Sequence, residues 1–341
     1  MKILITGVAG FIGRHVAARL VAAGHEVVGI DNLSTGFKEN IPDGVDWYVG
    51  QVFGGRGADY GQRKFIDPIM GDYKFDAVFH IGAFAAECLS PFAPTFTHQN
   101  NTVGTATLLA AAVRHKVKTF VFTSSIAVYG NQVPPFDESM NPKPVDTYGA
   151  SKLASELDIR AATERFGINH VIWRPFNVYG SYQSINDPFR NVVGIFMRNI
   201  MQGKPLPIFG TGEQIRAFSH IDEVAPAIAA CVDRPQSHNQ TFNIGGGIAY
   251  SVIQLANRVA EAMGVEPNIL HLPERHEVFK AFSKRNNLLK YFDDLVSPIT
   301  LSEGLAEMAE WVKATGMKDI KKFQHLEIEE GLPESWKEYI T

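Results

Sequence analysis

Short runs of β-branched and aromatic residues alternate with longer helical patterns through the first half of the chain. Six runs have mainly apolar interiors, as in strands that are buried on both faces of a parallel sheet: residues 2–6, 26–30, 46–50, 76–81, 118–124 and 169–174. Residues 11–24, 100–116 and 148–167 repeat apolar side chains at helical spacing, and two of these segments end at a glycine. This alternation predicts an α/β fold: a doubly wound parallel sheet of the Rossmann type, with helices on both faces.

The second half of the chain has a more mixed pattern. Helices are predicted near residues 192–202, 222–232, 252–263 and 301–315, and short strands at 206–210 and 241–245. We therefore expect a first domain over residues 1–175, to which segments near 217–245 return. A smaller mixed domain is expected mainly over residues 176–341.

Three glycines lie between the first strand and the first helix. In the stretch "ILITGVAGFIGRH", Gly7, Gly10 and Gly13 permit a tight turn, and they allow a pyrophosphate to approach the backbone at a helix N-terminus. Asp31 ends the next strand, where its carboxylate can accept both ribose hydroxyls and would repel a 2′-phosphate. The pattern favours NAD over NADP, with a ligand-free structural turn as the alternative.

Charge and composition exclude several other classes of protein. With 32 basic and 36 acidic residues, the net charge of −4 gives no reason to expect a nucleic-acid partner. Two cysteines without a CxxC pattern exclude a disulfide framework, and no apolar run reaches membrane-spanning length. Histidine and acidic residues do not gather at the spacings of metal ligands, so no metal is expected. We expect a cytoplasmic protein with no membrane association.

Several motifs occur in an order that suggests a family. The spacing Gly-x-x-Gly-x-x-Gly and the later pair Tyr148 and Lys152 resemble the extended short-chain dehydrogenase/reductase family. "FHIGAFAA", "NNTVGT" and "FTSSIAVYG" are similar to its segments around the cofactor and the catalytic serine. "RPFNVYG" and "RAFSHIDEVAPAI" resemble its nucleotide-sugar epimerase branch, which includes UDP-galactose 4-epimerases. The resemblance runs over most of the chain.

The resemblance implies a set of residues around NAD. By position in the family motifs, the set comprises Gly7, Gly10, Phe11, Ile12, Gly13, Asp31, Asn32, Gln51, Val52, Ile81, Gly82, Ala83, Asn101, Ser124, Tyr148, Lys152 and Phe176. One position departs from the family pattern, because Gln51 stands where an aspartate usually holds the adenine amino group. A glutamine carbonyl can accept the same hydrogen bond.

Tyr148 and Lys152 are four residues apart and therefore share one helix face. A free phenol, with a pKa near ~10, is a poor base at neutral pH. A neighbouring ammonium and the positive nicotinamide of NAD⁺ would favour the phenolate, and the lysine could also bind the nicotinamide ribose. The resemblance implies that Ser125 completes the catalytic set by hydrogen-bonding the reacting oxygen. The alternative is an ordinary solvated Tyr–Lys pair.

The resemblance also implies a UDP-sugar site in the second domain. Asn177 would contact the diphosphate–sugar region, with Asn191 and Arg190 nearby. Arg216 and Arg275 match two arginines that the family directs at UDP, and a guanidinium fork suits paired phosphate oxygens. By alignment, Phe282 would limit the space beside the sugar C2 substituent.

These observations predict an NAD-dependent UDP-hexose 4-epimerase that interconverts UDP-glucose and UDP-galactose through a 4-keto sugar. A UDP-uronic acid 4-epimerase remains the main alternative, because Arg190 could pair with a C6 carboxylate. A dehydratase is disfavoured because Ile126 and Ala127 stand where those enzymes usually carry an Asp-Glu pair. A non-catalytic NAD-binding regulator is disfavoured because Ser125, Tyr148 and Lys152 are all present.

A homodimer is expected, with helices near 100–115 and 148–166 forming a four-helix interface through Leu108, Leu109, Ala112, Leu153, Leu157 and Ala161.

Overall fold

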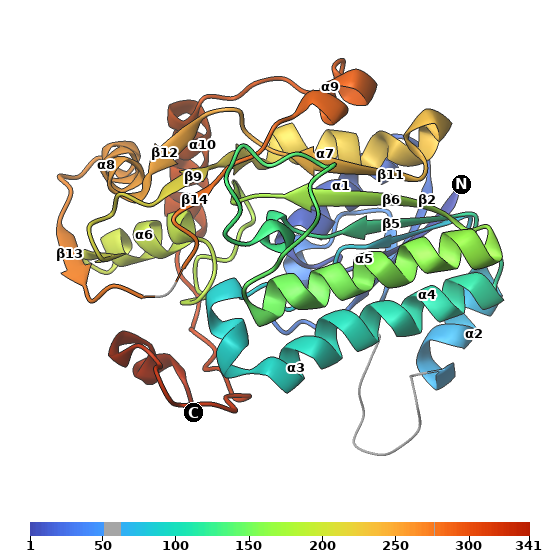
Figure 1. Cartoon of the computed structure of the whole chain (residues 1–341), viewed down its shortest axis with the longest axis horizontal. Helices are drawn as coiled ribbons and strands as arrows, with labels where there is room; N and C mark the ends of the chain where they lie inside the picture. Colours follow the sequence, from blue (N-terminus) through green and yellow to red (C-terminus); the bar gives the residue numbers. More distant parts are fainter. Residues whose placement is uncertain (51–62, 276) are drawn as a thin grey trace.

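A parallel sheet of seven strands forms the centre of the structure, a computed structural model that describes residues 1–50, 63–275 and 277–341 (Figure 1). The strand order is β11-β6-β5-β4-β1-β2-β3, and every neighbouring pair is parallel. The strands are β1 (Lys2–Thr6), β2 (Glu26–Asp31), β3 (Val45–Val49), β4 (Ala77–His80), β5 (Thr119–Thr123), β6 (Asn169–Pro175) and β11 (Gln240–Ile244). The predicted Rossmann-type sheet is confirmed.

Helices cover both faces of this sheet. One face carries α1 (Phe11–Ala22), α7 (Ile221–Ala230) and α9 (Asn286–Phe292), whose apolar side chains form one buried cluster with the strands. The other face carries α2 (Arg63–Tyr73), α4 (Gly104–Arg114) and α5 (Thr147–Phe166), which contribute to a second buried cluster. Figure 1 shows α4 and α5 side by side along that face.

The order of the strands reverses between β1 and β4. The chain runs from β1 outward to β3 and then crosses back to β4 on the other side of β1. The loops that follow β1 and β4 therefore diverge, and they leave a crevice at the carboxyl ends of the strands. Ligands of doubly wound sheets bind at such a point.

A smaller unit stands at this edge of the sheet. Its helices α6 (Val192–Met201), α8 (Val252–Met263) and α10 (Leu301–Thr315) enclose a separate apolar core. Its strands are short: β7 (Val178–Tyr179) pairs with β10 (Ser219–His220), β8 (Leu206–Phe209) with β13 (Ile269–Leu272), and β9 (Ile215–Ala217) with both β12 (Ala249–Ser251) and β14 (Lys280–Ala281). A short helix, α3 (Pro94–His98), lies between β4 and α4 in the sequence.

Parts of the second half return to the large sheet. β11 pairs with β6 along its whole length, and α7 packs against α1. The sequence pattern did not predict α2, α3 or α9. α2 carries Pro68 inside the helix, and α3 and α9 have five and seven residues, too few for a periodic signal.

Among the described residues, no helix combines the length and the apolar character that crossing a membrane requires.

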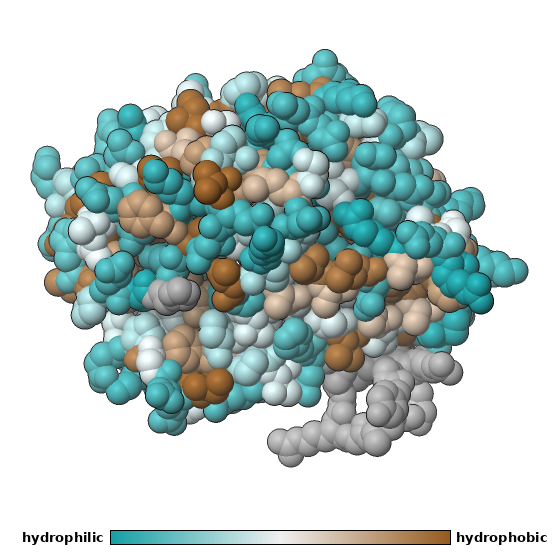
Figure 2. Space-filling view, viewed as in Figure 1, coloured by the Kyte–Doolittle hydropathy of each residue, from teal (hydrophilic) through white to brown (hydrophobic). Residues whose placement is uncertain are grey.

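An apolar strip runs over the face formed by α4 and α5 (Figure 2). Leu157 and Phe166 on α5 are 58% and 63% exposed, and Val103 beside the start of α4 is 49% exposed. The α4 side chains expected at a dimer interface, Leu108, Leu109 and Ala112, instead fill the core beneath the sheet. The exposed strip therefore belongs mainly to α5.

We propose that a second copy of the chain covers this strip. Leu157→Glu should convert a dimer to a monomer, because it places a charge at the centre of a buried apolar contact. Light scattering coupled to size exclusion would measure the mass. Val265→Glu, at an exposed apolar position beyond α8, is the matched control and should leave the mass unchanged. A monomeric wild-type protein at micromolar concentration would refute the proposal.

Candidate active site

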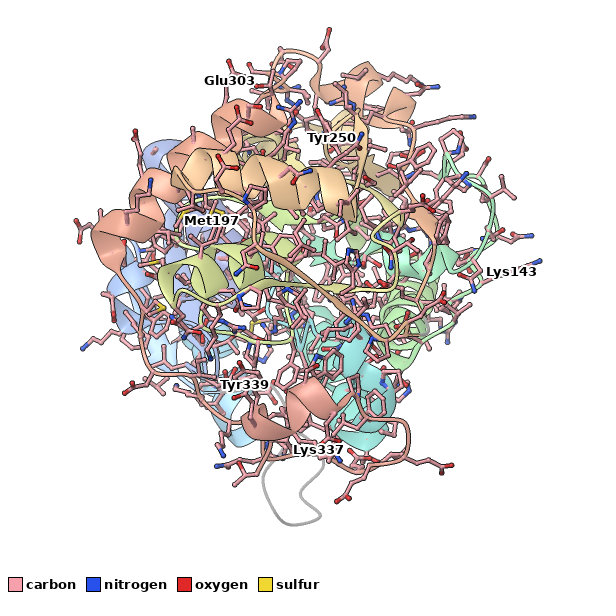
Figure 3. The ribbon with its side chains drawn as sticks, turned by 90° about the vertical axis from the view of Figure 1, so that its left-hand side faces the viewer. Lys143, Met197, Tyr250, Glu303, Lys337 and Tyr339 are labelled. Atoms are coloured by element: carbon pink, nitrogen blue, oxygen red, sulfur yellow. The ribbon has the colours of Figure 1, made fainter. Side chains whose placement is uncertain are left out.

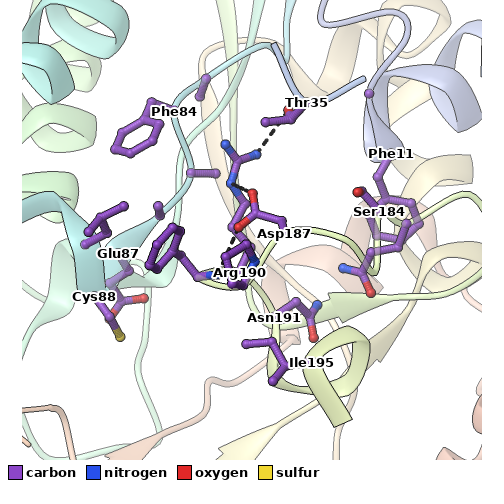
Figure 4. Close-up of a pocket in the computed structure, with 18 of the residues that line it drawn as sticks. Phe11, Thr35, Phe84, Glu87, Cys88, Ser184, Asp187, Arg190, Asn191 and Ile195 are labelled. Atoms are coloured by element: carbon purple, nitrogen blue, oxygen red, sulfur yellow. Dashed lines mark hydrogen bonds and ion pairs between the residues drawn. The ribbon is translucent and has the colours of Figure 1, made fainter. Parts of the chain in front are cut away.

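A cavity of about 1940 Å³ lies between the sheet and the smaller unit. Its walls come from the loops after β1, β2 and β4, from the start of α5, and from the segment leading into α6. Figure 4 shows Phe84, Glu87 and Cys88 on one side of it, with Asp187, Arg190 and Asn191 across from them. The cavity coincides with the crevice that the strand order creates.

The glycine loop forms one end of the cavity. Gly7 has a φ of +75°, and a Cβ added there would lie 2.7 Å from the Gly82 backbone. A Cβ on Gly13 would lie 1.9 Å from the Gly7 carbonyl oxygen. Only glycine therefore permits this loop to lie against both the β4 loop and the first turn of α1. The α1 N-terminus is left facing the cavity, where it favours an anion.

Asp31 stands at the end of β2, beside the glycine loop. Its carboxylate accepts the backbone N–H groups of Ala9 at 3.0 Å and Leu33 at 2.8 Å. Burial raises the pKa of Asp31, and these hydrogen bonds oppose that shift. The Gly10 N–H also bonds this carboxylate, whose two oxygens together have about four lone-pair sites, so the group can still accept a ribose hydroxyl.

The other residues expected around the cofactor fall into three groups. The cavity wall includes Phe11, Ile12, Asn32, Ile81, Gly82, Ala83 and Ser124. Asn101 lies behind the wall: its amide bonds both the N–H and the carbonyl of Phe84 and the hydroxyl of Ser151, so it shapes the β4 loop. Gln51 and Val52 lie outside the described residues.

Tyr148 and Lys152 project from the first turns of α5. Asp146 caps this helix by accepting the Gly149 N–H at 2.7 Å. The Ser125 hydroxyl lies close enough to the Tyr148 hydroxyl to act on its pKa, and both residues line the cavity. The Lys152 ammonium lies 5.8 Å from the centre of the Tyr148 ring. The three predicted catalytic residues are therefore together.

In this structure the phenol is held in its protonated form. Burial raises the pKa of Tyr148, and the carboxylates of Glu87 and Asp146 raise it further. The hydroxyl of Ser125 and the charge of Arg190 act in the opposite direction but do not outweigh burial. Activation of this phenol as a base requires a further positive charge in the cavity.

Lys152 is also shifted by its surroundings. Its ammonium donates to the Thr123 carbonyl at 2.8 Å and lies 4.8 Å from the Phe122 ring centre. Burial lowers the pKa of Lys152 to about 7, and the nearby carboxylate of Glu156 opposes the shift. The expectation that this ammonium, together with the nicotinamide of NAD⁺, lowers the Tyr148 pKa stays a prediction.

Ser124 belongs to a buried polar network that the sequence did not predict. Its hydroxyl donates to Glu156 at 2.6 Å, and Glu156 receives two bonds from Arg174, at 2.9 and 2.6 Å. Arg174 also donates to the Tyr129 hydroxyl, which donates to Asn243 at 2.8 Å. The network joins α5 to β6, to β11 and to the residue that follows β5.

Two arginines converge at the other end of the cavity. Arg216 and Arg275 each place a guanidinium nitrogen 3.4 Å from the same carboxylate oxygen of Glu277. Arg216 also donates to the carbonyls of Val278 and Phe279. The Glu277 carboxylate thus lies between the guanidinium groups of Arg216 and Arg275, and this geometry is suited to binding a diphosphate.

The segment between β6 and α6 supplies three of the expected residues. Asn177 and Asn191 have φ angles of +39° and +47°, a region that asparagine tolerates better than most residues. Asn177 donates to the Ala217 carbonyl at 2.9 Å, and Asn191 caps α6 through the Val193 N–H at 3.1 Å. Both line the cavity.

Arg190 points toward the cofactor side. Its Nε lies 2.9 Å from Asp187, and its Nη1 donates to the Thr35 hydroxyl at 3.4 Å (Figure 4). Thr35 belongs to the loop after Asp31. The charge of Arg190 is therefore already paired with a carboxylate.

Two expected residues are not on the main cavity wall. Phe176 is buried and borders a separate side pocket of about 70 Å³ next to Ser125. Phe282 packs against an apolar cluster that includes Phe136 and Ala281, so the structure gives no support to its expected role in limiting the substrate's C2 substituent.

Glu87 lines the cavity and was not predicted from the sequence. It follows β4 and lies beside Ser125 and Arg216 at the border between the main cavity and the side pocket. Its side chain is accessible within the open cavity, yet the surrounding walls displace enough water to raise its pKa to about 7. No sequence motif marked this position.

One group of acidic and histidine side chains gathers outside the cavity. Within the described ranges, His220, Asp222 and Glu307 bring ligand atoms within 4.8 Å of one another. His220 is the N-cap of α7, and both carboxylates are exposed. His220 accepts the Asp222 N–H as the cap of α7, and its other ring nitrogen pairs with Glu307 on α10.

Comparison with known proteins places the chain in a family. The sequence model described as the NAD dependent epimerase/dehydratase family matches residues 3–245. A UDP-glucose 4-epimerase of Mycolicibacterium smegmatis is 31% identical over 92% of this chain and 99% of its own length. The crystal structure of a Thermotoga maritima UDP-glucose 4-epimerase with UDP-glucose has a TM-score of 0.85 and 29% identity, covering 92% of this chain and 99% of that one. A Bacillus cereus UDP-glucuronic acid 4-epimerase, solved with UDP-glucuronic acid and NAD, has a TM-score of 0.82 and 26% identity, covering 93% of this chain and 100% of that one.

These matches extend over both units of the structure and agree with the glycine loop, Asp31 and the Ser125–Tyr148–Lys152 set. The chain belongs to the NAD-dependent epimerase/dehydratase family.

Proposed function

We propose that this protein is a UDP-hexose 4-epimerase that interconverts UDP-glucose and UDP-galactose with NAD kept bound. The observation that carries the proposal is the Ser125–Tyr148 hydroxyl pair, which lies between a dinucleotide loop and a pair of converging arginines. A sugar attached to a diphosphate at the arginines can present a hydroxyl to Tyr148.

Different parts of the cavity wall suit NAD and the UDP-sugar. Gly7, Gly13 and the α1 N-terminus suit the pyrophosphate of NAD, and Asp31 suits its adenosine ribose. When bound, NAD⁺ supplies the hydride acceptor and then the hydride donor. Lys152 can donate to the nicotinamide ribose from the position in which it now donates to Thr123.

Tyr148 moves the proton in the proposed reaction. Its phenolate takes the proton of the sugar 4-hydroxyl while hydride leaves C4, and Ser125 holds the reacting oxygen by a hydrogen bond. The resulting 4-keto sugar receives hydride on its other face, and Tyr148 returns the proton to O4. Hydride and proton are both restored, so the reaction has no net redox change.

The arginines keep the intermediate in the site. The keto sugar must turn its opposite face toward the nicotinamide without leaving. Arg216 and Arg275 can hold the diphosphate while the sugar rotates about that tether, because a guanidinium fork binds paired oxygens in a defined geometry.

A neutral sugar fits the charges of the cavity better than a uronic acid. The Bacillus cereus relative binds UDP-glucuronic acid, and Arg190 could in principle receive such a carboxylate. In this chain, however, Arg190 is paired with Asp187. Glu87 adds a second carboxylate beside Ser125, where a uronate would meet repulsion.

A dehydratase and a non-catalytic regulator are weaker alternatives. Ile126 and Ala127 follow Ser125, and neither can donate a proton to a leaving 6-hydroxyl. A non-catalytic NAD-binding regulator would not require Ser125 and Tyr148 to lie together. It would also not require Lys152, whose burial destabilises the fold.

The central test is turnover of defined UDP-sugars followed by NMR. The wild-type protein should interconvert UDP-glucose and UDP-galactose. Tyr148→Phe should retain its fold and NAD content but lose about 10²–10⁴-fold in kcat, as is typical when a general acid–base is removed. Near-normal turnover by this variant would exclude Tyr148 as the base.

Lys152 gives a test based on stability and pH. The folded pKa of Lys152 is about 7, and an unfolded lysine titrates near ~10.4, so the unfolded state binds more protons between these values. The free energy of unfolding of the wild-type protein should therefore increase as the pH rises through that window. The destabilisation that comes from burying the Lys152 ammonium is greatest at pH 7 and below. Lys152→Met should raise the Tm of NAD-free protein most at pH 6–7, and the difference should shrink toward pH 10.

Thermal melts across this pH range would measure the effect. Lys143→Met replaces an exposed lysine and is the control. A Tm difference between Lys152→Met and wild type that does not change with pH would contradict the assigned shift.

Glu87 tests the choice between neutral and acidic sugars. Glu87→Gln keeps the size of the side chain and removes its charge. The ratio of kcat/KM for UDP-glucuronate to that for UDP-glucose should rise at least ~10-fold at pH 8, because two carboxylates a few ångströms apart repel by more than about 1.4 kcal/mol. Glu213→Gln, an exposed acid outside the cavity wall, should leave the ratio unchanged. A wild-type preference for the uronate would overturn the neutral-sugar assignment.

A further inference from the structure

The last 25 residues of the chain cross the mouth of the cavity. Residues 317–341, here called the C-terminal strap, follow α10 and lie beyond the residues that the family model matches. Several strap residues line the cavity: Asp319, Lys321, Phe323, His325, Trp336 and Tyr339. The strap is therefore part of the ligand site, although it belongs to neither the Rossmann sheet nor the core of the smaller unit.

The first part of the strap is attached to the cofactor side. The Lys318 N–H donates to Asn186 at 2.9 Å, and its ammonium pairs with Glu39. The Lys321 ammonium donates to the Leu33 carbonyl at 3.2 Å. Leu33 and Glu39 both lie in the segment after Asp31.

The middle part is attached to the wall after β4. The ring of Phe323 stacks on Phe84 at 5.5 Å, and His325 stacks on Phe96 at 4.0 Å. Glu327 accepts the N–H of Phe96 at 2.8 Å in the first turn of α3.

The strap is also closed on itself. Phe323 donates its N–H to the Tyr339 carbonyl at 2.9 Å, and Thr341 donates to the Phe323 carbonyl at 3.0 Å. These bonds fix the position of the short helix η7 (Glu334–Tyr339), which ends the strap.

This helix inserts Trp336 among aromatic side chains of the nucleotide end. Trp336 is 6% exposed, and its ring centre lies 5.4 Å from that of Phe189 and 6.4 Å from that of Phe209. The Arg275 guanidinium carbon lies 4.2 Å from the Phe209 ring centre and 5.8 Å from that of Trp336. Figure 3 shows the same helix, with Tyr339 on its side nearer α6 and Lys337 on its outer side.

We infer that Trp336 is a positioning residue for nucleotide binding, which holds Arg275 in the orientation that the diphosphate of a UDP-sugar requires. The inference rests on the proposed function. Arg275 has a long side chain that would otherwise sample many rotamers, and ordering it on binding costs affinity. Contact with the aromatic pair Phe209 and Trp336 orders the guanidinium before the ligand arrives. Glu277 then fixes the direction of its N–H groups.

This arrangement separates binding from chemistry. Trp336 packs in one apolar cluster with Phe189, Phe209 and the residues Ala86 and Leu89 that follow β4. This cluster does not include Ser125, Tyr148 or Lys152. Loss of the indole should therefore weaken the hold on UDP without altering proton transfer or NAD retention.

Titration calorimetry with UDP alone tests the inference without depending on turnover. Trp336→Ala should weaken the Kd for UDP at least ~10-fold, as expected when a buried aromatic anchor is lost. Its KM for the UDP-sugar should rise in parallel, with kcat within about 3-fold of wild type and NAD content unchanged. Trp336→Phe should recover most of the affinity. Lys337→Ala, an exposed position on the same helix, should behave as wild type.

A double-mutant cycle shows whether Trp336 acts through Arg275. The losses in UDP affinity for Trp336→Ala and Arg275→Ala should be strongly non-additive, because the second change removes the group that the first one orders. Additive losses, unchanged or tighter UDP binding by Trp336→Ala, or a parallel loss of NAD would each overturn the inference. UDP binding that depends on Trp336 in a protein that turns over no UDP-hexose would support this inference and contradict only the proposed function.

Discussion

The buried ion pair between Glu156 and Arg174 sets the position of α5. Glu156 lies four residues beyond Lys152 and eight beyond Tyr148, so the three side chains share one face of α5. Arg174 on β6 holds Glu156 with two hydrogen bonds in a site from which water is excluded. Because the pair fixes the rotation of α5 about its axis, it also directs Tyr148 and Lys152 into the cavity. Removing one partner of such a pair typically costs about 3–5 kcal/mol, since the other charge remains buried. The Ser125–Tyr148 contact thus depends on a bond that touches no ligand.

The cavity carries charges that oppose one another. Glu87 and Asp146 work with burial to keep the Tyr148 phenol protonated, and burial makes Lys152 only weakly basic. At the far end, Arg216 and Arg275 share Glu277. In the proposed function, ligands would change both arrangements. A cationic nicotinamide would lower the pKa of Tyr148, and a diphosphate would compete with Glu277 for Arg216 and Arg275. In the proposed function, activation of Tyr148 is therefore coupled to binding of both the cofactor and the diphosphate.

Local patterns predicted the sheet and the cofactor loop, because the signals for each lie within a few consecutive residues. The six strands of the first half, the glycine turn and the Tyr148–Lys152 pair all have this property. Residues whose role depends on tertiary contacts were placed less well. Asn101 holds the β4 loop behind the cavity wall, Phe282 packs away from it, and Leu108 and Leu109 fill the core rather than an interface. Glu87 and the strap were missed for the same reason, since only the fold brings residues 87 and 336 to one cavity.

The seventh strand has a consequence for how the chain must fold. β11 begins 65 residues after β6 ends, yet it completes the sheet beside it, and α7, just before β11, packs against α1 at the opposite end of the sequence. The apolar face of α1 remains uncovered until residues 221–230 have been synthesised and brought back. Strands that are far apart in the sequence can pair only after a long loop has closed. The entropy lost on loop closure precedes the stabilising contacts, and folding is therefore slower. When only the first 175 residues have been made, β6 lacks its neighbour β11 and α1 lacks its neighbour α7, so completion of the sheet waits for the segment that carries both.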